Sequence, residues 1–141
     1  MFKNLLPIVL IIFCSHTLAA TLEANTYRCV SALNQTLANS SFKRLREYRL
    51  VVGEYEFSDD RSKLYIRLVR PIKNEFGHRA VFANVVYNVG NHVLEDITAD
   101  PDEPIIIKYD ANKSKLIEKS CINKINGVSP RRAHLLAMRH M

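Results

Sequence analysis

The segment LYIRLV at residues 64–69 alternates its side chains with a period of two. Leu64, Ile66 and Leu68 would share one face of an extended chain, because successive strand side chains point to opposite faces. One apolar face is typical of a strand in an antiparallel sheet that covers a core. Pro71 ends the strand, because proline has no donor for a central ladder.

Other strands are expected on both sides of this segment, at residues 48–57, 79–87, 92–97 and 105–107. Turns rich in Asp, Asn, Ser or Gly separate them at 58–62 and 88–91, and an Asp- and Pro-rich loop covers 98–104.

Upstream of the sheet, a short strand is expected around Tyr27 and a helix of about nine to twelve residues after it. Val30, Ala32, Leu33 and Leu37 are spaced as on one helical face. The sequence therefore predicts one α+β domain, with an N-terminal α-helix packed on an antiparallel β-sheet of about five strands.

Residues 1–20 have the pattern of a secretory signal peptide. Lys3 supplies the positive charge, residues 5–13 form an apolar run, and the small residues Ala19 and Ala20 offer a cleavage site. The run is shorter than the roughly 20 residues of a membrane span. We therefore expect a secreted protein with no membrane segment in its mature form, and Cys14 is expected to leave with the leader.

Two cysteines remain, Cys29 and Cys121, in an expected oxidising compartment where disulfides persist. A bridge across so long a loop would stabilise the fold by roughly 4 to 5 kcal/mol in the chain-entropy model. The alternative, a reactive thiol, lacks a second cysteine or base nearby in the sequence. We expect a domain over residues 21–121 closed by one disulfide, followed by a basic tail over 122–141.

The chain has 20 Lys and Arg residues against 14 Asp and Glu, a formal net charge of +6. This balance permits binding to nucleic acid or to an acidic surface. No phosphate-binding loop or Gly-x-Ser-x-Gly turn is present, and the histidines are not spaced as metal ligands. We expect no cofactor and no metal. Acceptor sequons for N-glycosylation stand at Asn34, Asn39 and Asn112.

Tyr27-Arg28-Cys29 shortly after a leader, then a helix, a basic sheet and a late Cys121, resembles the secreted Tyr-x-Cys effectors of powdery mildew fungi. That group is similar in fold to the fungal guanyl-specific ribonucleases. The segment GHRAVF at residues 77–82 resembles the ribonuclease strand that carries an arginine before an apolar pair and Phe. The resemblance implies a ribonuclease-like fold and a secreted effector, acting outside or inside a host plant cell to suppress immunity.

The ribonuclease site needs a carboxylate, a histidine and an arginine for phosphodiester cleavage. Only the arginine has a match, at Arg79. Val69 stands where the resemblance places the glutamate, and Ala99 stands where it places the histidine. The resemblance therefore implies a protein that is not an enzyme, with a host plant protein and RNA as candidate partners. Candidate contacts are Arg44, Arg46, Arg67 and Arg70, with Arg79 as a phosphate site.

Two other functions stay open. Residues 50–53 resemble the hairpin wedge of cystatin-like protease inhibitors, although the preceding Gln is missing. An active ribonuclease could instead use Glu54 or Glu56 with His92, if the fold brought them together. A bridge from the first strand to the end of the domain would favour the ribonuclease-like fold over the cystatin-like one.

Overall fold

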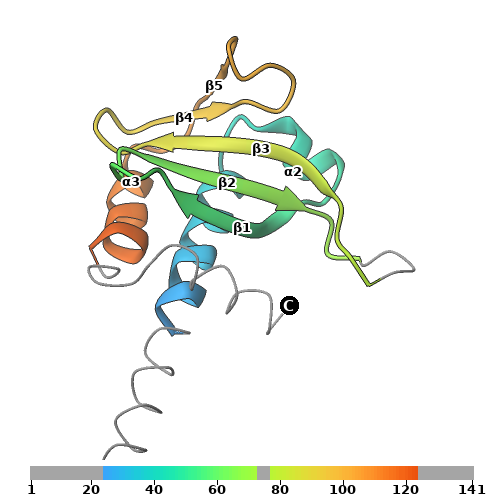
Figure 1. Cartoon of the computed structure of the whole chain (residues 1–141), viewed down its shortest axis with the longest axis horizontal. Coiled ribbons are helices and arrows are strands. Elements are labelled where there is room, and N and C mark those ends of the chain that lie inside the picture. The colour runs from blue at the N-terminus through green and yellow to red at the C-terminus, as the bar shows by residue number, and fades with distance from the viewer. Residues whose placement is uncertain (1–23, 73–76, 124–141) are drawn as a thin grey trace, which may run out of the picture.

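The computed structural model describes residues 24–72 and 77–123 (Figure 1). The expected leader, with Cys14, lies outside the described residues, as does the basic tail from residue 124 onward. The π-helix η1 (Glu118–Ile122) ends the described elements, and Ile122 packs against the core. Ile122, the first residue after the expected boundary at Cys121, thus belongs to η1.

Five antiparallel strands form one sheet in sequence order: β1 (Val51–Phe57), β2 (Lys63–Val69), β3 (Val81–Asn88), β4 (Val93–Asp96) and β5 (Ile105–Ile107). Along β2, Leu64, Ile66 and Leu68 are buried, whereas Tyr65 and Arg67 are exposed. The predicted α+β class and the five-stranded antiparallel sheet are confirmed.

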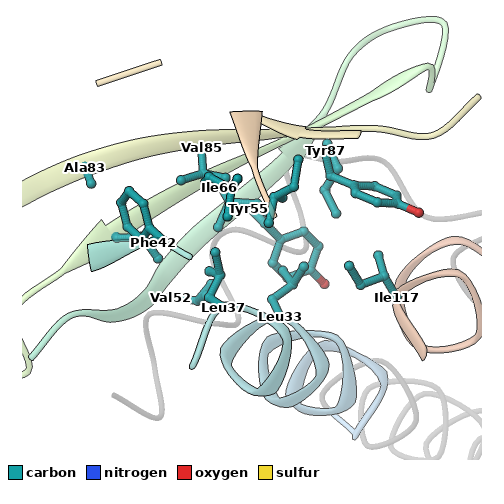
Figure 2. Packing of buried hydrophobic residues seen from close by; sticks show 14 of the residues in the cluster. Leu33, Leu37, Phe42, Val52, Tyr55, Ile66, Ala83, Val85, Tyr87 and Ile117 are labelled. Atoms are coloured by element: carbon teal, nitrogen blue, oxygen red, sulfur yellow. The ribbon is translucent and has the colours of Figure 1, made fainter. Parts of the chain in front are cut away.

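A helix over residues 24–38 crosses one face of the sheet, and the core lies between the two (Figures 1 and 2). Leu33 and Leu37 point from this N-terminal helix toward Val52 and Ile66, and Ile117 closes the core from another helix (Figure 2). Burying a side chain of this size stabilises the fold by about 1.5 to 3 kcal/mol. The packing of this helix therefore supplies much of the stability of the sheet.

The expected strand around Tyr27 is wrong, because Tyr27 belongs to the N-terminal helix and is 75% exposed. The buried face of that helix includes Thr26, Cys29 and Thr36 beside the leucines. The hydroxyl of the buried Thr36 donates a hydrogen bond to the backbone oxygen of Ala32, 2.8 Å away. A pattern that counts only apolar residues overlooks the two threonines and starts the helix too late.

Three strands begin later than expected. Tyr48 ends α2 (Lys43–Glu47), a short helix that the sequence did not indicate, and Arg49 has a φ of 50°. Arg79 precedes β3, and His92 lies in the turn before β4 with a φ of 58°. A positive φ is uncommon for residues with a Cβ and takes Arg49 and His92 out of the extended conformation.

The C-terminal part of the domain is helical, through α3 (Asn112–Ile117) and η1. This segment packs below the end of the sheet where the β3–β4 hairpin turns (Figure 1). It carries Cys121, which forms a disulfide with Cys29 across 92 residues, with the two Cα atoms 4.7 Å apart. Both cysteines are fully buried. The predicted bridge is confirmed, and it joins the N-terminal helix to η1.

Asn34 fixes the N-terminal helix to the edge of the sheet. Its Oδ1 accepts a hydrogen bond from the backbone N–H of Val52, 2.9 Å away. We expect Asn34→Ala to lower the free energy of unfolding by about 1 to 3 kcal/mol, because the N–H of buried Val52 would lose its partner. Urea denaturation measures the loss. Asn39→Ala is the matched control, since Asn39 is exposed, and equal losses in the two variants would contradict this role for Asn34.

Candidate binding surface

Tyr48, Arg70 and Phe82 form a stacked group that we call the Arg70 cluster. The guanidinium carbon of Arg70 lies 4.5 Å from the centre of the Phe82 ring and 5.8 Å from that of Tyr48. The two rings are 6.2 Å apart and inclined by 27°. The three residues come from different elements: Tyr48 ends α2, Arg70 follows β2, and Phe82 lies in β3. Their contact joins these elements at one end of the sheet.

A β-bulge in β3 places Phe82 in this cluster. Leu68 of β2 pairs with Ala83, whereas the next residue, Val69, pairs with Val81. Phe82 is therefore the extra residue on β3, without a partner of its own in the register. Bulges redirect side chains and bend the strand. The half-buried Phe82 ring thus supports Arg70 at the sheet end.

Arg70 and several apolar residues close to it in the sequence are exposed. Arg70 itself is exposed, and Tyr48 is 39% exposed. Close by in the sequence, Ile72 is 78% exposed and Val81 is 50% exposed. Among the described residues, the ion pairs are Arg67 with Glu54 and His92 with Glu118, so no described carboxylate pairs with Arg70. The cluster presents a positive charge that the described fold does not neutralise.

The other predicted contact arginines differ in their environments. Arg44 and Arg46 are exposed on α2, in the turn before Tyr48. Arg67 lies on β2, where its Nη1 donates to Glu54 Oε2 at 2.9 Å, so that its charge is balanced. Arg79 lies before β3, is partly buried and is engaged within the fold. Among the predicted contact arginines, Arg70 is thus the one that is both exposed and stacked on aromatic rings.

The position that the ribonuclease resemblance assigns to the glutamate is filled by a buried valine. Val69 is 4% exposed and packs against Gly53, the extra residue of a second bulge, in β1. A Cβ added at Gly53 would lie 2.7 Å from Cγ2 of Val69. Ala99, at the position assigned to the histidine, is exposed and offers only a methyl group. Neither side chain can transfer a proton.

Glu54, Glu56 and His92 are not brought together. Glu54 bonds Arg67, and the exposed Glu56 pairs in register with the exposed Tyr65. His92 instead lies at the end of the core, with its Nδ1 2.8 Å from the hydroxyl of the buried Tyr87. The glutamates therefore contact Arg67 and Tyr65 of β2, whereas the exposed His92 contacts Tyr87 and Glu118 at the β3–β4 turn.

His92 is part of a polar group that joins the β3–β4 hairpin to the C-terminal helices. Its Nδ1 lies 3.1 Å from Oε1 of Glu118 in η1, and its backbone oxygen accepts a hydrogen bond from the Tyr109 hydroxyl. Burial raises the pKa of both Tyr87 and Tyr109, and the charge of Glu118 adds to the effect. These contacts hold η1, and with it Cys121, against the sheet.

Buried tyrosines predict a loss of stability at alkaline pH. Burial raises the pKa of Tyr87, Tyr109 and Tyr55 above the ordinary value of 10.0. Above that pH the unfolded chain releases protons that the folded chain keeps, so the free energy of unfolding falls as the pH rises. We expect Tyr87→Phe to make this fall shallower in urea titrations from pH 8 to 12. Tyr27→Phe, at an exposed position, is the control, and an equally shallow fall there would contradict the assignment to Tyr87.

Two of the three sequons are open to solvent. Asn39 and Asn112 are exposed, whereas Asn34 is partly buried and bonds the backbone of Val52.

Within residues 24–72 and 77–123, no three His, Cys, Asp or Glu side chains are grouped as metal ligands. No helix in the same ranges is long and apolar enough to cross a membrane.

No protein-family model matches this chain, and neither a curated protein nor a solved structure is significantly similar to it.

Proposed function

We propose that this chain is a secreted effector of a plant-pathogenic fungus that binds a host plant protein and suppresses immunity, using a ribonuclease-like fold without catalysis. The leader pattern supports secretion, and the buried disulfide fits an oxidising compartment. Entry into the host cell after secretion belongs to the same proposal.

The observation that carries the non-catalytic part is the burial of Val69 against Gly53. A general acid and a general base each contribute roughly 100- to 10,000-fold to such a reaction. A buried valine and an exposed alanine replace them at the positions that the resemblance assigns. The sheet then serves as a rigid support for binding residues at its ends and in its loops.

RNA remains the second candidate ligand. Arg44 and Arg46 on α2 are exposed and could contact phosphates, and Arg79 is the residue that matches the ribonuclease phosphate contact. The cystatin-like alternative gains no support from the geometry, because residues 50–53 enter an edge strand after α2 and do not form the tip of a hairpin.

The test is a cleavage assay with the purified chain from residue 21 onward, total RNA and a guanosine-containing dinucleotide as substrates. We expect no cleavage above the buffer background, and capture of a specific protein from plant leaf extract. An active fungal guanyl-specific ribonuclease is the positive control. Cleavage at a comparable rate would refute the non-catalytic proposal, and RNA capture without any protein would refute the choice of partner.

A further inference from the structure

We infer that the Arg70 cluster is the docking point for a protein partner that presents a carboxylate within an apolar surface. The inference rests on the proposed binding function and adds the place of contact and the chemistry of the partner. Two exposed apolar residues lie close to it along the chain and in the register: Ile72 follows Arg70 by two residues, and Val81 pairs with Val69, the residue before Arg70. We call these two residues the apolar rim.

The first step is that Arg70 is held in place before any partner arrives. Its guanidinium lies over Phe82 at 4.5 Å and near Tyr48 at 5.8 Å, and aromatic faces attract such a cation. A planar guanidinium held by aromatic rings keeps the fork of donors that matches a carboxylate. A partner therefore meets an ordered donor group.

The second step is that the charge of Arg70 is available. Arg67, three residues before Arg70, forms an ion pair with Glu54 at 2.9 Å. Arg70 is exposed and forms no ion pair with a carboxylate among the described residues. An arginine that is fixed and that no described carboxylate neutralises is suited to an anion from another molecule.

The third step favours a protein over RNA. Arg70 covers a face of the half-buried Phe82 ring, so a base cannot stack directly on that ring face. The rim adds two large apolar side chains, Ile72 and Val81, at 78% and 50% exposure. Such side chains offer nothing to a phosphate backbone, whereas arginine and tyrosine beside apolar groups are typical of the energetic centres of protein interfaces.

The fourth step is that the support is rigid. Phe82 is fixed by its bulge between β2 and β3, and Tyr48 is fixed at the end of α2, where its N–H donates to the Arg44 oxygen at 3.0 Å. Phe82 thus stands on a strand, and Tyr48 and Arg70 lie directly after α2 and β2, next to regular elements that hold binding groups in place better than loops do.

The experiment selects 16-residue peptides from a random phage-displayed library on the immobilised chain from residue 21 onward. The best peptide is then titrated by fluorescence anisotropy against the wild type, Arg70→Gln, Arg70→Lys and Lys63→Gln. Lys63 is exposed at the opposite end of β2, so Lys63→Gln removes one charge without touching the cluster. A 12-nucleotide single-stranded RNA is titrated in parallel.

We expect the selected peptides to carry Asp or Glu beside Leu, Ile or Phe. Arg70→Gln should weaken their binding by about tenfold or more, and Arg70→Lys should also weaken it, because lysine keeps the charge but not the fork. Lys63→Gln should bind within about twofold of the wild type. Circular dichroism verifies that each variant is folded.

Peptides without an acidic residue, no enrichment at all, or equal binding by Arg70→Gln would overturn the inference. So would RNA that binds through Arg70 more tightly than the peptide. A plant protein captured equally by the wild type and by Arg70→Gln would also refute this docking point and leave the proposed function standing. RNA cleavage would refute the proposed function without affecting the peptide result.

Discussion

Replacing Cys29 and Cys121 together by alanine is expected to lower the free energy of unfolding by about 4 to 5 kcal/mol. The bridge closes a loop across 92 residues of sequence, and without it the unfolded chain gains the entropy of that open loop. A domain of this size has a total stability of about 5 to 15 kcal/mol, so the bridge would account for at least about a quarter of it.

Guanidinium denaturation of the chain from residue 21 onward measures this effect, and the wild type under a strong reducing agent provides a second route to the open chain. The reduced wild type keeps both side chains, so it separates the loss of the cross-link from the loss of the two buried sulfurs. A loss of less than about 1 kcal/mol in both samples would show that the fold holds its ends together without the bridge.

Gly53→Ala is expected to lower the free energy of unfolding by about 3 kcal/mol, which is large for the addition of one methyl group. The new Cβ would lie 2.7 Å and 2.8 Å from the two γ-carbons of Val69, closer than side chains pack. Either the bulge in β1 or the end of β2 must move. Thermal and urea denaturation measure the loss.

A double variant identifies the cause. Val69→Ala removes both γ-carbons that the new Cβ would meet, so Gly53→Ala should cost much less in the Val69→Ala background than in the wild type. Gly90→Ala is the matched control, because a Cβ there meets nothing within 4 Å, and we expect a change within about 0.5 kcal/mol. Additive losses at Gly53 and Val69 would mean that the two residues do not share this contact.

The strands could be predicted because the alternation of apolar and polar residues is contained in the sequence of each strand. The buried residues Leu64, Ile66 and Leu68 of β2 are those that the period of two selects. The C-terminal helices were not predictable in this way, because Ile117 and Cys121 are the only fully buried residues of α3 and η1. Two buried positions four residues apart are too few to define a helical face among basic and polar neighbours.

The binding surface was predictable in its residues but not in its arrangement. The sequence alone shows that Arg70 is one of several basic residues in and around β2, and that Tyr48 and Phe82 are aromatic. Their stacking depends on a bulge that shifts the register between Leu68 and Val69 by one residue on β3. Register is set by the pairing of two strands, which the sequence of either strand alone does not contain. The same holds for Gly53, whose role appears only when Val69 lies beside it.

The joined cysteines also change what a protease can do to this molecule. Any single cut of the backbone between Cys29 and Cys121 leaves two fragments that remain covalently attached through the buried sulfurs. The fragments cannot diffuse apart, so the strands can stay paired and Arg70 can keep its aromatic supports after the cut. We therefore expect nicked molecules to retain binding, with the cut visible by electrophoresis only after reduction.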